Sequence, residues 1–100
     1  MALADISEYT RMARDSENNV IQTGSEPARI TQQVGVTGVS AQSAAFDSAT
    51  KFVRIHVDVP TRIKFGTNPT ATATDPRMAA GATEFFGVLP GQKIAVILTT

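Results

Sequence analysis

The stretch FVRIHVDVPTRIKF, residues 52–65, decides the fold class because apolar side chains alternate with polar ones along two successive runs. In the first run, β-branched residues occupy every second position from 53 to 59. In the second run, Ile63 and Phe65 alternate with basic residues. A period of two places successive side chains on opposite faces of a β-strand. Both runs are therefore predicted to be strands with one solvated face, and Pro60 between them marks a corner or a sheet edge.

The segments around this stretch also read as strands. RITQQVGV, residues 29–36, repeats the alternation. TEFFGVL (83–89) and KIAVILT (93–99) are apolar on both faces and are predicted to be central strands, joined as a hairpin by a type II turn at Pro90–Gly91. Short strands separated by Gly and Pro, with no helical pattern after residue 28, predict an all-β fold: a small β-sandwich, jelly roll or barrel.

The segment FGTNPTATATDPRMAAG, residues 65–81, connects two of these strands. TNP and DP initiate turns, because Pro fixes φ and Asn or Asp accepts hydrogen bonds from its own backbone. TATAT between them, residues 70–74, suits a short strand, so the segment is predicted to be a turn, a short strand and a second turn. Its glycines lack the spacing of a phosphate-binding loop.

The first 27 residues follow a different pattern. Ile6, Tyr9 and Met12 fall near one face of a helix, whereas DSENN, residues 15–19, has a turn composition. This stretch is predicted to be an extended or partly helical arm, residues 1–27, before a β-sandwich domain, residues 28–100. Such an arm adds little to a β core, so its deletion is expected to leave a folded domain.

Composition and charge exclude several classes of function. The net charge is zero, although residues 1–26 hold five acidic residues and two arginines and the remainder carries the opposite excess. With basic residues limited to positions such as Arg54, Arg62, Lys64 and Arg77, no nucleic-acid partner is expected. No cysteine is present, which excludes disulfides and thiolate sites. No signal peptide or run of 18 apolar residues is present, so no membrane contact is expected and synthesis in the cytoplasm is favoured.

Catalysis and metal binding lack the residues they need. His56 is the single histidine, and a surface or interface position is predicted for it, although a titrating network with its strand neighbours Arg54 and Asp58 is conceivable. The carboxylates near predicted strands or turns of the β domain, Asp58, Asp75 and Glu84, show no pairing in the sequence. The chain is therefore predicted to be no enzyme, with no cofactor, no metal and no small-molecule substrate.

Adjacent aromatic residues indicate a binding surface instead. Phe85 and Phe86 must point to opposite faces of one strand. One of them is predicted to be ordinary core, and the other fills a second layer or forms an interface hot spot.

Residues 52–98 carry a pattern that resembles small virion proteins of tailed bacteriophages. A strand ending in FG is followed by xPTATA and then by GxxEFFxVxPGxKIAVI. The matching residues of the last motif are Gly81, Glu84, Phe85, Phe86, Val88, Pro90, Gly91, Lys93, Ile94, Ala95, Val96 and Ile97. The resemblance covers about half the chain, and its residues are those of turns, core and strand ends, so no binding residue is transferred with it.

The resemblance implies a capsid decoration or cement protein with a jelly-roll-like sandwich. Such a protein would bind the major capsid protein on the outer surface of the virion, as a homo-oligomer at capsid symmetry axes. A head–tail or tail component, or a sandwich module that binds carbohydrate or protein, are the alternatives. The absence of Trp disfavours carbohydrate.

The expected attachment elements are the acidic arm and the turn segment Thr67 to Arg77. Their candidate partner-binding residues are Asp5, Glu8, Tyr9, Arg11, Arg14, Asn68, Thr70, Asp75 and Arg77.

Overall fold

The structure is a computed structural model that describes residues 2–99. Within this range the chain forms ten β-strands and no helix, which confirms the predicted all-β class. The strands are β1 (Leu3–Tyr9), β2 (Met12–Arg14), β3 (Val20–Gly24), β4 (Ile30–Gly35), β5 (Ala41–Gln42), β6 (Phe52–Val57), β7 (Thr61–Gly66), β8 (Arg77–Met78), β9 (Thr83–Gly87) and β10 (Lys93–Leu98).

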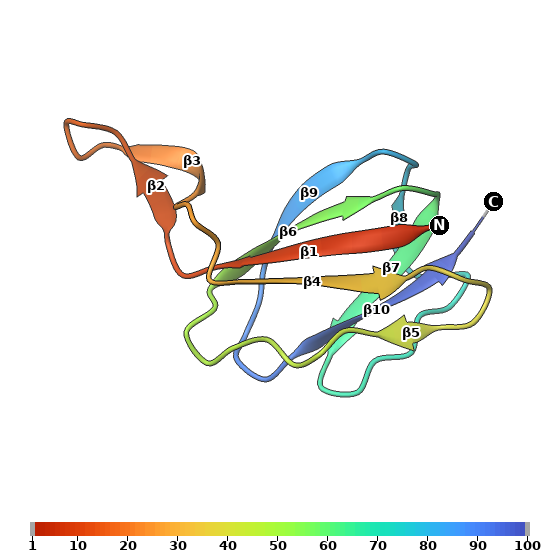
Figure 1. The fold of residues 1–100 in the computed structure, drawn as a ribbon. Helices are drawn as coiled ribbons and strands as arrows, with labels where there is room; N and C mark the ends of the chain where they lie inside the picture. Colours follow the sequence, from red (N-terminus) through yellow and green to blue (C-terminus); the bar gives the residue numbers. More distant parts are fainter. Residues whose placement is uncertain (1, 100) are drawn as a thin grey trace.

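Eight of the ten strands form two antiparallel sheets, which we call sheet I and sheet II. Sheet I has the strand order β4-β1-β6-β9, and sheet II has the order β5-β10-β7-β8. The remaining pair, β2 and β3, forms a hairpin that projects from one end of this body (Figure 1). Pro60 lies where the chain leaves β6 of sheet I and enters β7 of sheet II, so the predicted corner is confirmed.

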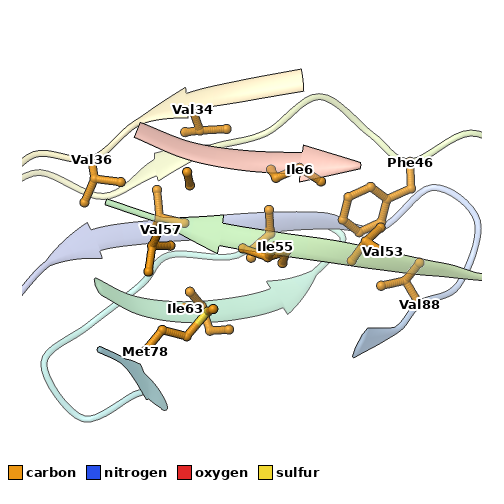
Figure 2. Packing of buried hydrophobic residues seen from close by; sticks show 13 residues of the cluster. Ile6, Val34, Val36, Phe46, Val53, Ile55, Val57, Ile63, Met78 and Val88 are labelled. Carbon is orange, nitrogen blue, oxygen red and sulfur yellow. The ribbon is translucent and has the colours of Figure 1, made fainter. Parts of the chain in front are cut away.

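The core lies between the inner faces of the two sheets (Figure 2). Sheet I contributes Ile6 and Ile55, and sheet II contributes Ile63, Ile94 and Val96, all of them almost inaccessible to solvent. Burial of each such side chain contributes about 1.5–3 kcal/mol to folding. The alternation predicted in residues 53–57 is therefore the alternation of core and surface.

The N-terminal segment differs from the prediction, because no helical arm is seen. Residues 3–9 form β1, which pairs with both β4 and β6 and lies inside sheet I. Ala4 and Ile6 are completely buried. The sequence of β1 does not show the alternation of apolar and polar residues that predicts a strand. Its third inward-facing residue is Glu8, a charged side chain that is normally assigned to solvent.

Two expectations about the C-terminal strands need correction. β10 is central, as predicted, but β9 is an edge strand that pairs only with β6. A continuous apolar run does not distinguish a central strand from an edge strand, because the side chains of an edge strand can also pack against another layer of the fold. The turn at Pro90–Gly91 has the expected type II features, with Gly91 at φ 80° and the Gln92 N–H bonded to the Leu89 carbonyl at 3.2 Å. It links the two sheets, however, so no hairpin forms there.

The segment between β7 and β8 is a fixed loop without the short strand predicted at residues 70–74. The Asp75 carboxylate accepts a hydrogen bond from the Thr72 N–H at 2.8 Å, and the Ala71 N–H donates to the Ser40 hydroxyl at 2.9 Å. These contacts use the backbone N–H groups that a strand partner would need. Hydrogen bonds to side chains, one local and one distant in the sequence, therefore replace sheet pairing in this segment.

Candidate partner-binding site

The β2–β3 hairpin is the element most exposed to a partner. Its strands pair only with each other, and it extends beyond the end of the body (Figure 1). Met12 and Val20 are apolar, yet 40% and 52% of their surfaces are accessible. A two-stranded ribbon without a core is marginally stable on its own, so exposed apolar side chains on it do little for the fold. They are available for contact with another molecule.

The tip of the hairpin is organised by one carboxylate. Asp15 Oδ1 accepts hydrogen bonds from the backbone N–H groups of Glu17 and Asn19, each at 2.9 Å. Asn18 takes the left-handed conformation, with φ 66°, and its carbonyl accepts a hydrogen bond from Arg14 Nη1 at 2.9 Å. The bond from the Asn19 backbone, followed by that from Glu17, lowers the pKa of Asp15 below its ordinary value. The tip thus has a defined shape before any partner binds.

The base of the hairpin is locked against sheet I through Tyr9. The Tyr9 ring stacks on Phe52 with a centroid distance of 5.4 Å, and its hydroxyl donates to the Glu26 carboxylate at 2.7 Å. Gly24 of β3 lies directly on the ring, where any Cβ would overlap ring atoms. Burial, followed by the hydrogen bond to Glu26, raises the pKa of Tyr9. This predicted site residue is 4% exposed, so it positions the hairpin from beneath.

Glu8 is also committed to the interior. Its carboxylate accepts hydrogen bonds from the Thr50 hydroxyl at 2.7 Å, from the Asp47 N–H at 2.9 Å and from Gln32 Nε2 at 3.3 Å. Only 1% of the residue is accessible. Its surroundings therefore fit a structural role, in which it ties β1 to β4 and to the segment before β6.

The other predicted residues are spread over separate places. Arg11 and Arg14 are exposed in or beside the hairpin, whereas Asp5 lies on the outer face of sheet I and accepts a hydrogen bond from Gln33 at 2.8 Å. The remaining four lie on the β7–β8 loop and on β8, away from the hairpin in Figure 1: Asn68, Thr70, Asp75 and Arg77. The structure does not bring the two predicted elements together into one site.

A second surface, which sequence reading did not assemble, is a basic face on sheet II. The residues that precede or follow Ile63, Met78 and Ile94 point away from the core. They include four cations: Arg62, Lys64, Arg77 and Lys93. Within residues 2–99 none of the four cations lies within ion-pair distance of a carboxylate, although Arg62 Nη1 donates a hydrogen bond to the Asp75 carbonyl at 2.9 Å. These cations are scattered in the sequence, and the strand register brings them onto one face.

The outer face of sheet I carries an aromatic row. Phe52 lies between Tyr9 and Phe85, with centroid distances of 5.4 and 6.0 Å. Phe86 points the other way and packs against the core beside Phe65. The opposite orientations predicted for Phe85 and Phe86 are confirmed, and Phe85 is the exposed one, at 45%.

His56 belongs to a small polar network on the same outer face. Its Nδ1 lies 2.8 Å from the Thr83 hydroxyl, and its Nε2 lies 3.6 Å from Asp58 Oδ1. No group of three potential metal ligands occurs within the described residues. No helix in that range is long and apolar enough to cross a membrane. The arrangement resembles a surface hydrogen-bond network more than a reactive centre.

Comparison with known proteins adds no family. No family model, no curated protein and no solved structure matches this chain.

Met12 and Val20 were absent from the predicted set. The signal that could have found them is the turn sequence DSENN between two short runs that contain apolar residues, which is typical of a hairpin with a longer loop.

Proposed function

We propose that this chain is a structural protein of a tailed-bacteriophage virion, a decoration protein that binds the outside of the capsid shell and bridges its subunits. The resemblance of residues 52–98 to such proteins suggests the class. We also propose that the two sheets form a jelly-roll-like sandwich, since they share one core between facing sheets.

The projecting hairpin is the observation that carries the proposal. It presents Met12 and Val20 to solvent on a ribbon with a pre-shaped tip, and it is fixed to the body at Tyr9 and Gly24. A pre-shaped element loses less conformational entropy on binding than an unstructured arm would. A hairpin of this kind suits insertion between neighbouring subunits of a shell.

The basic face of sheet II supplies a second contact surface. Its four cations, which form no ion pair within residues 2–99, suit a shell surface rich in carboxylates. Two weak contacts made by one rigid molecule reinforce each other through effective concentration. A ligand that binds only the assembled shell then stabilises the assembly by mass action.

The proposal is tested by co-sedimentation with undecorated shells assembled from the major capsid protein of the same genome. The variant M12S/V20S removes the two exposed apolar side chains of the hairpin. The matched control V39S removes an equally apolar residue that is 75% exposed elsewhere. We expect the wild type and V39S to sediment with shells, and M12S/V20S to remain mostly in the supernatant.

Binding of M12S/V20S at the wild-type level would remove the hairpin from the mechanism, and absence of wild-type binding would refute capsid decoration. A third variant, K64Q/R77Q, tests the basic face through two exposed cations and keeps the Arg62 bond to the Asp75 carbonyl. It should bind more weakly than the wild type at low salt, with a difference that shrinks as salt screens the charges.

A further inference from the structure

The two sheets have four edges, and one of them is open over five residues and carries an exposed aromatic side chain. Sheet II ends in β5 and β8, which are two residues each and too short to recruit another strand. The β4 edge of sheet I presents the polar side chains of Thr31 and Gln33, and Ile30 at its start is 39% exposed. The opposite edge is β9, where Phe85 is 45% exposed and Leu89, which follows the strand, is 66% exposed.

The pairing of β9 with β6 fixes which backbone groups face outward. Ala82 and Val88 are bonded to β6 and its flank, through Val57 N–H to Ala82 O and Val88 N–H to Lys51 O. Bonded and non-bonded residues alternate along an antiparallel ladder. The N–H and C=O groups of Thr83, Phe85 and Gly87 therefore point away from β6, and no partner for them occurs within the described residues.

We propose that β9 is a self-association site, at which two copies of this chain pair antiparallel across a two-fold axis and merge their sheets I into one eight-stranded sheet. The occupant is a second copy because the edge is complementary to itself. With Phe85 opposite Phe85 of the second copy, Thr83 of each copy lies opposite Gly87 of the other. Every outward-facing N–H and C=O of the three residues then has a partner.

The side chains support the same register. Thr83 meets a glycine, which leaves room for it, and Glu84 lies opposite Phe86 of the second copy, so the two carboxylates are not directly opposed. The exposed Phe85 rings become neighbours. The aromatic row Tyr9–Phe52–Phe85 of each copy then continues into that of the other across the axis.

The inference is independent of the proposed function, although it has a consequence for it. The hairpin leaves sheet I at the Tyr9 end, which is also the Gly87 end of β9. Antiparallel pairing places the Gly87 ends of the two copies far apart. The dimer therefore carries its two hairpins at opposite ends, as a bivalent molecule.

A backbone variant with a matched control tests the proposal. Gly87→Pro removes one outward-facing N–H without removing a bond to β6, whereas Gly87→Ala keeps that N–H. A Cβ at this position meets no atom within 4 Å, so the Ala variant fits the fold. Sedimentation equilibrium of the full chain should show a wild-type dimer, an Ala variant that dimerises equally well, and a Pro variant whose dissociation constant rises about tenfold or more.

Crosslinking tests the register and does not depend on the Pro variant folding. In the proposed pair the two copies of residue 85 are the one position on β9 that faces itself, with Cα atoms about 5.5 Å apart, a distance that a disulfide can span. Since the chain has no cysteine, Phe85→Cys is unique, and mild oxidation should convert it to a covalent dimer much faster than Val39→Cys. A monomeric wild type at all concentrations, or equal crosslinking of the two variants, would overturn the proposal. Failure of capsid binding would not affect it.

Discussion

At the scale of single residues, Glu8 is the least expected part of the core. A buried carboxylate is costly unless its oxygens are hydrogen-bonded. Here the bonds come from Asp47, Thr50 and Gln32, which are distant from Glu8 in the chain. Residue type alone does not predict this, because the donors are recruited from segments 24 to 42 positions away. Sequence reading therefore placed Glu8 on a solvated arm, while the same reading of Val53, Ile55 and Val57 identified core residues correctly.

Glu8→Ala should lower the free energy of unfolding by about 3 kcal/mol, because it leaves a part-buried N–H and a buried hydroxyl without their acceptor. Urea denaturation followed by circular dichroism measures the change. The control is Asp5→Ala, on the outer face of the same strand, which should change the free energy of unfolding by less than about 1 kcal/mol. Equal effects of the two substitutions would mean that Glu8 is not the buried acceptor described.

Gly24 and Gly35 form a matched pair for testing the base of the hairpin. Gly24→Ala places a methyl group in the Tyr9 ring and should destabilise the protein by about 1–3 kcal/mol. Gly35→Ala meets no atom within 4 Å and should be neutral or slightly stabilising. Thermal unfolding of the two variants distinguishes them, and a Gly24→Ala variant as stable as Gly35→Ala would show that β3 does not lie on Tyr9.

At the scale of elements, the strands that pattern reading found are those whose environment differs between the two faces. β6 and β7 fulfil this condition, and their inward and outward residues were assigned correctly. β10 was recognised instead by its continuous apolar run, and three successive residues of it are buried: Ile94, Ala95 and Val96. The β2–β3 hairpin forms a separate two-stranded sheet, its sequence shows no clear alternation, and only its turn residues were recognisable. The loop at residues 67–76 shows the reverse case, in which an alternating pattern does not form a strand. Thr and Ala alternate there, but the backbone N–H groups donate to the side chains of Asp75 and Ser40 instead of to a neighbouring strand.

The Asp15 turn at the hairpin tip should respond to acid. Its carboxylate is stabilised by backbone N–H groups, which holds its pKa below the ordinary aspartate value. The stabilisation is complete above the pKa of an unfolded aspartate, about 4, and is lost as the pH falls through the lower value of the folded state. NMR titration should show the Asn19 and Glu17 amide resonances shifting with a midpoint below the pKa of an unfolded aspartate, which is about 4.

Asp15→Asn should abolish this titration, whereas Glu17→Gln should preserve it. A normal or elevated midpoint for Asp15 would indicate an open tip.

At the scale of the whole molecule, the structure changes what deletion of the N-terminus should do. Sequence reading treated residues 1–26 as dispensable for folding, but β1 lies between β4 and β6 in sheet I. Removal of residues 1–26 should therefore abolish cooperative unfolding, because it removes Ala4, Ile6 and Glu8 from the core. Replacement of residues 15–19 alone by an Asn-Gly turn should shift the melting temperature by only a few degrees, about what a change at exposed residues causes.

Differential scanning calorimetry of both proteins separates the two views. A cooperative transition in the chain that lacks residues 1–26 would show that β1 is not a structural strand of sheet I.

The most direct test of the proposed function is the number of copies in the virion. Quantitative mass spectrometry of purified particles, from the phage whose genome encodes this chain, gives its ratio to the major capsid protein. Decoration of the shell predicts a fixed ratio with copies in the hundreds, an order of magnitude set by the many equivalent subunits of a symmetric shell, together with release of the chain by mild denaturant while the shells remain intact. A copy number of about a dozen or fewer, as expected for a ring at the tail or connector, or absence from the particle, would contradict it.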